Sequence, residues 1–97
     1  MSGKRSKLEI YLEILHIISR GETKPTRIMY KANLSWIPLQ EVFKHLLSQN
    51  NINEVLIDQR KGYEITDKGR RALRYFEEMN KLVRTNQSPT LIPIQQY

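Results

Sequence analysis

The first apolar pattern along the chain predicts a helix over residues 6–20. Its apolar residues recur at steps of three and four, with others beside them: Leu8, Leu12, Leu15 and Ile18, then Ile10, Tyr11, Ile14 and Ile17. Ser6 and Glu9 have the spacing of a capping box, and Gly21 follows as a stop signal. The stripe is wider than a surface helix needs, so we expect this helix to cross the centre of the core or to face a second subunit as well.

Two further helices are predicted by the pattern that follows. Pro25 suits a first helical turn, and Asn33 can end the short helix after it. Ser35 is a candidate N-cap for a longer helix that runs to about Gln49. The inward stripe of that longer helix consists of Leu39, Val42, Phe43, Leu46 and Leu47. The short break between the two helices favours a tight turn and a steep crossing angle.

Residues 52–66 predict a β-hairpin, and a fourth helix follows it. The segment 52–59 has β-branched content and partial alternation, and the strand 63–66 comes after Arg60, Lys61 and Gly62, which we expect to form a turn with a basic tip. Apolar residues then recur at helical spacing: Ala72, Leu73, Tyr75, Phe76, Met79, Leu82 and Val83.

These elements divide the chain into four expected parts. A flexible basic N-terminus covers 1–5, a winged helix-turn-helix domain 6–66, a C-terminal dimerisation helix 67–85, and an uncharged, non-helical tail 86–97. The expected fold class is mainly α with a small β-hairpin, in the order α-α-α-β-β-α, because three helices, a hairpin and a helix form a winged helix-turn-helix.

Three stretches also carry a resemblance to a known family. RSKLEI (5–10), KPTRIMYKANLSW (24–36) and YEITDKGRR (63–71) resemble the archaeal winged-helix family of small basic DNA-binding regulators, which includes the dimeric chromatin-like proteins of Sulfolobus. The resemblance covers about residues 5–84. It implies binding of double-stranded DNA through the helix over 35–49 and the wing, and dimerisation through the last helix as an antiparallel coiled coil.

Length and charge agree with such a function. Ninety-seven residues suffice for one domain. With 16 Lys and Arg against 10 Asp and Glu, the net charge is +6, which favours a polyanionic partner. Residues 1–31 carry a net +4, residues 32–65 a net −1 and residues 66–97 a net +3, so the excess lies at the two ends of the chain.

The candidate DNA-binding residues are cations and polar or aromatic side chains of the second and third helices and of the hairpin: Arg27, Lys31, Ser35, Trp36, Gln40, Lys44, Arg60 and Lys61. The cations and the hydroxyl suit phosphates, and Gln40 suits an adenine edge. Alternatives stay open, because charges on amphipathic helices and turns often only face solvent, and a lone Trp36 often packs in a core. The longer helix is itself neutral, so phosphate contacts should dominate and sequence preference should be modest.

The candidate dimer interface consists of Ala72, Phe76, Met79 and Val83, at steps of four, three and four. One small core cannot easily cover this seam together with the broad face of the first helix. We therefore expect a homodimer. The opposing interpretation is that the start of the last helix packs on its own domain and the rest frays.

Other function classes find little support. Without cysteine, and with only His16 and His45, the chain offers no metal site, and no phosphate-binding glycine loop or nucleophile motif indicates an enzyme, a cofactor or a small-molecule ligand. No apolar run suits a membrane or a signal peptide, so we expect a cytoplasmic, nucleoid-associated protein. The alternative function is a protein-interaction module that docks a partner through the apolar tail and the helix over 6–20.

Overall fold

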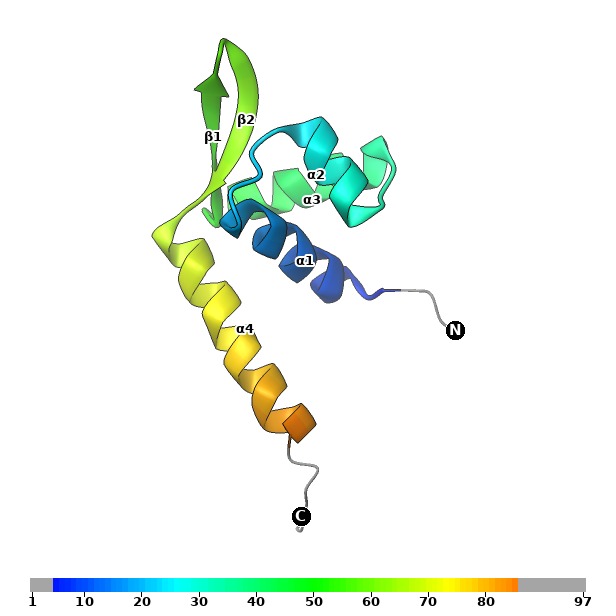
Figure 1. Cartoon of the computed structure of the whole chain (residues 1–97), viewed down its shortest axis with the longest axis vertical. Helices are drawn as coiled ribbons and strands as arrows, with labels where there is room; N and C mark the ends of the chain where they lie inside the picture. Colours follow the sequence, from blue (N-terminus) through cyan, green and yellow to red (C-terminus); the bar gives the residue numbers. More distant parts are fainter. Residues whose placement is uncertain (1–4, 86–97) are drawn as a thin grey trace.

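A computed structural model describes residues 5–85 of the chain (Figure 1). Its elements are α1 (Lys7–Ser19), α2 (Pro25–Ala32), α3 (Trp36–Ser48), β1 (Ile52–Ile57), β2 (Arg60–Ile65) and α4 (Asp67–Thr85). This order confirms the predicted fold class. Residues 1–4 and 86–97 lie outside the described residues, and with them most of the expected flexible N-terminus and all of the expected non-helical tail.

The first helices begin and end where local chemistry favours it. The Glu9 amide donates to Ser6 Oγ at 3.1 Å and the Ser6 amide donates to Glu9 Oε1 at 2.8 Å, which confirms the capping box. Pro25 is the first residue of α2, and Asn33 ends that helix in the left-handed conformation, with φ of 56°. Ser35 is the N-cap of α3, but its hydroxyl makes no capping hydrogen bond.

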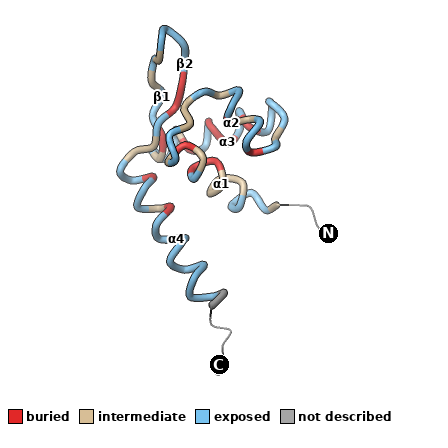
Figure 2. Tube along the Cα trace, viewed as in Figure 1, coloured by how far each residue is buried: buried red, intermediate tan, exposed pale blue. Residues whose placement is uncertain are grey.

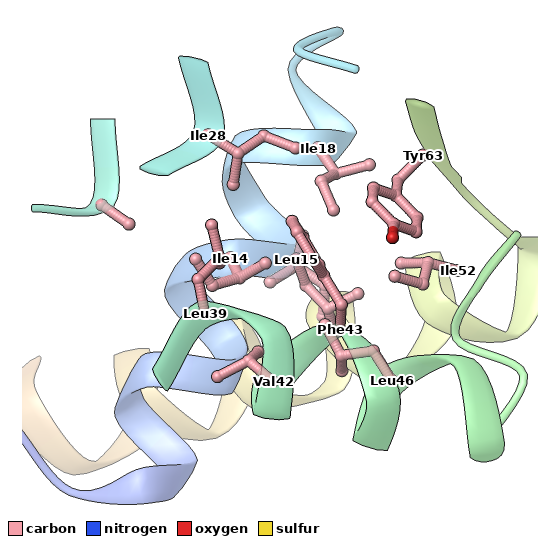
Figure 3. Close-up of a cluster of buried hydrophobic side chains, with 12 residues drawn as sticks. Ile14, Leu15, Ile18, Ile28, Leu39, Val42, Phe43, Leu46, Ile52 and Tyr63 are labelled. Carbon is pink, nitrogen blue, oxygen red and sulfur yellow. The ribbon is translucent and has the colours of Figure 1, made fainter. Parts of the chain in front are cut away.

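The core lies around α1, which contacts α2, α3, β2 and α4 (Figure 1). The buried hydrophobic side chains come from α1, α2, α3, the hairpin and the start of α4 (Figure 3): Ile14, Leu15, Ile18, Ile28, Ala32, Leu39, Val42, Phe43, Leu46, Ile52, Tyr63 and Leu73. Tyr63 stacks on Phe43 with a ring-centroid distance of 4.2 Å, which joins the hairpin to α3. The wide stripe of α1 therefore does cross the centre of the core.

The hairpin turn differs from the sequence prediction. β1 and β2 pair antiparallel from Ile52 opposite Ile65 to Ile57 opposite Arg60. The turn is formed by Asp58 and Gln59, with φ of 52° and 65°. Positive φ at both central residues matches the two-residue type I′ turn that suits the twist of a hairpin. The predicted turn at residues 60–62 is therefore wrong, and its two cations lie at the start of β2 instead of at the tip.

At Gly62, strand β2 lies close to the loop before α2. A Cβ at Gly62 would lie 3.0 Å from the Thr23 carbonyl oxygen and 3.2 Å from Ile57 Cδ1. Next to it, the Tyr63 amide donates to the same Thr23 oxygen at 3.0 Å. The glycine that resembled a turn residue is thus a contact residue, because a Cβ here would crowd the Thr23 carbonyl oxygen and force β2 or the loop to shift slightly.

The start of α4 is fixed to the end of α3. The Gly69 amide donates to Thr66 Oγ1 at 2.9 Å, and that hydroxyl donates to the Asn50 carbonyl oxygen at 2.7 Å. A Cβ at Gly69 would lie only 2.2 Å from the carbonyl oxygen of Asn51. Gly69 is therefore required by packing. Beyond its first turns α4 projects away from the other elements, and most of its residues are exposed (Figure 2).

Candidate nucleic-acid interface

One face of α3 buries Leu39, Val42, Phe43 and Leu46, and the opposite face is exposed. The exposed face follows from the helical period, because residues three and four apart lie on the same side. We call it the α3 row: Ile37, Gln40, Glu41, Lys44 and Ser48. It holds an aliphatic, an amide, a carboxylate, an ammonium and a hydroxyl group. A helix of this kind offers several distinct contacts to a ligand that lies along it.

A cleft separates the hairpin from the starts of α2 and α3. We call it the wing cleft, and its lining comes from three parts of the chain: Lys24, Pro25, Thr26, Trp36, Ile57, Asp58, Arg60, Lys61 and Gly62. Trp36 is 42% exposed, so it is neither a core residue nor freely solvated. The cleft brings together three of the predicted residues, Trp36, Arg60 and Lys61.

Lys24 and Thr26 are functional candidates that the sequence pattern did not single out. Lys24 is the N-cap of α2, is exposed, and lines the wing cleft together with the two cations of β2. Its position directly before Pro25 marks a helix start. The sequence could have indicated Lys24, because helix N-termini favour anionic groups and a cation at the start of α2 would strengthen that preference.

The two hairpin cations differ in their partners. Lys61 Nζ lies 3.2 Å from Glu54 Oε2 on β1. The hydrogen bond to Glu54, then the negative charge of Tyr63 in its ionised form and that of Glu54, hold the pKa of Lys61 above its ordinary value. Arg60, the first residue after the turn, is exposed and lines the wing cleft. The positive charge of Lys61 is therefore partly compensated by Glu54 within the hairpin.

Arg27 and Lys31 do not line the wing cleft. Arg27 Nε and Lys31 Nζ each lie 3.2 Å from Glu22 Oε1, and the Lys24 amide donates to Glu22 Oε2 at 3.3 Å. Burial alone would raise the pKa of the Glu22 carboxyl, but these hydrogen bonds from Lys31, the Lys24 amide and Arg27 outweigh it and hold the pKa below its ordinary value. The structure thus gives both predicted phosphate ligands an internal anion as partner.

The remaining predicted residues lie apart from the cleft. Gln40 is exposed on the α3 row, and Ser35 is exposed at the start of α3. Lys44 lines a groove between α1 and α3 together with Lys7, Glu41 and other residues. In that groove the rings of Tyr11 and His45 stack at a centroid distance of 4.4 Å.

The apolar seam of α4 continues beyond the domain core. Phe76, Met79 and Val83 line a groove between α4 and α1 that also contains Leu8 and Leu12. Met79 is 47% exposed and Val83 75%. Ala72, the fourth predicted interface residue, is half-buried and does not line this groove. His16 Nδ1 lies 3.5 Å from Glu77 Oε2 at its edge.

Other kinds of site find no counterpart in the described part of the chain. It contains no group of three or more His, Cys, Asp or Glu side chains that could hold a metal ion. No helix within residues 5–85 has the length and apolar character needed to cross a membrane.

A short turn between α2 and α3, an exposed α3 row and a two-stranded hairpin beside it define a winged-helix domain. The chain belongs to the winged helix-turn-helix family, whose model matches residues 4–84. It is 35% identical over 80 residues to the protein MJ0287 of Methanocaldococcus jannaschii, and the match covers 82% of this chain and 78% of the relative.

Two solved structures extend the comparison. Sso10a-2, a DNA-binding protein from Sulfolobus solfataricus, superposes with a TM-score of 0.68 at 29% identity, over 81% of this chain and 82% of its own. FabT from Streptococcus pneumoniae, in complex with DNA, superposes with a TM-score of 0.64 at 16% identity, over 75% of this chain and 54% of its own, and so shares the fold. The resemblance to archaeal winged-helix proteins, including one from Sulfolobus, is confirmed.

Proposed function

We propose that the chain binds double-stranded DNA as a homodimer and acts as a transcriptional regulator or a nucleoid-associated protein in the cytoplasm. The observation that carries this proposal is the exposed α3 row beside the cationic wing cleft. An α-helix fits the major groove of B-DNA, and a hairpin beside it can follow the flanking backbone. The DNA-binding protein Sso10a-2 and the DNA complex of FabT support the same use of the fold here.

Phosphate contacts come from the wing cleft and from the surfaces next to it. Lys24, Arg60 and Lys61 face a common cleft, with Trp36 positioned to contact sugars. Arg27 and Lys31 add phosphate contacts when a phosphate replaces Glu22 as their partner, and the Ser35 hydroxyl adds another. Gln40 and Lys44 face the bases from the α3 row. Because Glu41 opposes Lys44 in that row, most of the affinity comes from the backbone and sequence preference is modest.

The dimer forms through α4, where a second copy covers the apolar groove against α1. Ala72, Phe76, Met79 and Val83 form the seam, and both Met79 and Val83 are exposed in the single chain. Contiguous exposed apolar side chains that line a groove, as here, are typical of an interaction surface. A two-fold dimer presents two copies of α3, which reach successive major grooves when they lie about 34 Å apart.

Fluorescence anisotropy titrations of duplex DNA at several salt concentrations test the DNA-binding proposal. The double variant Lys24→Ala, Arg60→Ala should flatten the slope of log K against log salt by about 0.9 for each phosphate contact that it removes. Arg74→Ala, Lys81→Ala, which removes one arginine and one lysine from α4 instead, is the matched control and should leave the slope unchanged. Binding that does not depend on salt, or no binding at low salt, contradicts the proposal.

The same assay separates the two groups of cations. The double variant Arg27→Ala, Lys31→Ala should weaken binding on every DNA sequence, but less than the wing-cleft variant, because Glu22 already compensates these charges. If the slope of log K against log salt does not change, Arg27 and Lys31 pair only with Glu22 and make no phosphate contact.

The alternative function, a protein-interaction module, is favoured by one observation, the apolar groove of α1 and α4. In that case the groove receives another protein, together with the tail 86–97, which lies outside the described residues. The two functions differ in salt-dependent DNA binding, which an interaction module lacks at physiological ionic strength.

A further inference from the structure

Ile37 is an aliphatic side chain that the fold does not use. It lies in the first turn of α3 and is 74% exposed, whereas the leucine and valine side chains of this helix are buried or half-buried. A β-branched residue loses side-chain freedom in a helix, and here no burial offsets that cost. Neither stability nor helix formation accounts for an isoleucine at this position.

The position of Ile37 within the α3 row indicates what it contacts. Helix-turn-helix proteins contact base edges with the N-terminal residues of the second helix. Ile37 is the first member of the row, followed one helical turn later by Gln40 and Glu41. Trp36, although adjacent in sequence, lines the wing cleft with its cations. Trp36 is four residues before Gln40, but of the two large side chains at the start of α3 only Ile37 lies outside the wing cleft, which leaves Ile37 to the row proposed to face the bases.

The major groove presents one apolar group, the C5-methyl group of thymine. An amide, a carboxylate or an ammonium group finds hydrogen-bonding partners on the other base edges, but an aliphatic side chain does not. We infer that Ile37 is a specificity-determining residue that packs against a thymine methyl group in the major groove. This inference rests on the proposed function, because it requires α3 to lie in that groove.

Uracil-substituted DNA isolates this contact, since replacing thymine by uracil removes only the methyl group. A duplex selected by the wild-type protein from genomic fragments is prepared in a thymine and a uracil form, and both are titrated by fluorescence anisotropy. The wild-type protein should bind the uracil duplex about four-fold more weakly for each methyl group that Ile37 covers. Ile37→Ala should bind both forms equally and match the wild-type affinity for uracil DNA.

Leu56→Ala is the matched control, because Leu56 is an equally exposed aliphatic residue, 79% exposed, on the hairpin. It should keep the wild-type preference for thymine. Equal binding of both duplexes by the wild-type protein, or a thymine preference that persists in Ile37→Ala, overturns the inference while DNA binding itself stands. Failure to bind either duplex at low salt overturns the proposed function instead, so the two failures are distinguishable.

Discussion

The elements before α4 bury or half-bury most of their apolar side chains, whereas α4 exposes most of its own. Ile14, Ile28 and Leu39 have no exposed surface, but Tyr75, Leu82 and Val83 are each more than two-thirds exposed. In α4 only the first turns reach the core, through Leu73 and the close contact at Gly69. This difference indicates two separate roles for apolar side chains in this chain. Those of the earlier elements stabilise the fold, which we call the internal task, whereas the exposed ones of α4 are available to contact another molecule, which we call the outward task.

The largest expected effect tests the outward task. Met79→Asp should convert the proposed homodimer to a monomer, because a carboxylate buried without a partner in the seam costs about 3–5 kcal/mol. Sedimentation equilibrium at tens of micromolar protein measures the change, and DNA affinity should fall with it, because linkage of the two half-sites is lost. Arg74→Asp, on the opposite side of α4 from the seam, is the control and should remain dimeric. A wild-type monomer at this concentration would contradict the proposed dimer.

A leucine in each region tests the internal task. Leu39→Ala should lower the free energy of unfolding by about 3 kcal/mol, because the fully buried side chain leaves a cavity in the core. Leu82→Ala removes the same atoms from a side chain that is 67% exposed, and should change the stability of the monomer by less than about 0.5 kcal/mol. Urea denaturation of both variants in the Met79→Asp background excludes any contribution from association. If the two variants lost the same free energy of unfolding, the proposed difference between the buried core and the exposed part of α4 would be wrong.

The junction between the regions should respond to a smaller change. Gly69→Ala should destabilise the fold by about 2 kcal/mol, since the added methyl group collides with the Asn51 carbonyl oxygen and backbone must move. Arg70→Ala, the next residue, is exposed and should stay within about 0.5 kcal/mol of the wild type. Thermal unfolding measures both. A stabilised Gly69→Ala variant would show that only helix propensity matters at this position.

The smallest expected effect concerns the polar surface of the packed elements. The pKa of Glu22 is lowered in the folded state, so its ion pairs stabilise the fold fully above its unfolded value of 4.5. That contribution is lost as the pH falls through the lower folded-state pKa. Glu22→Gln should therefore be less stable than the wild type at neutral pH, and the difference should shrink below pH 4.5. Glu64→Gln, an exposed glutamate on β2, should follow the wild-type curve.

Much of the architecture could be predicted because it depends on signals close together in the sequence. The capping box of Ser6 and Glu9, the first-turn Pro25 and the left-handed Asn33 all act within a few residues of themselves. The order of helices and strands follows from apolar periodicity. These features need no knowledge of distant contacts.

The predictions that failed depend on contacts between distant segments. Gly62 resembled a turn residue, yet its role is set by Thr23, and the actual turn includes Gln59, which carries no turn signal. Gly69 lies in a first helical turn, where glycine costs little, but the close contact with Asn51 decides its role. In the candidate site, Arg27 and Lys31 stay predicted phosphate ligands, and their pairing with Glu22 depends on the path of the loop before α2, which the sequence pattern does not reveal.

The hydrogen bond from the Tyr63 amide to the Thr23 carbonyl oxygen has a consequence for flexibility. It joins the base of the hairpin to the loop that leads into α2, so the two walls of the wing cleft are linked by backbone. This hydrogen bond, with the close approach of Gly62 to Thr23, restrains movement of the wing relative to the loop that carries Lys24. If the cleft binds a phosphate as proposed, little conformational entropy is lost on binding, as in other preorganised sites.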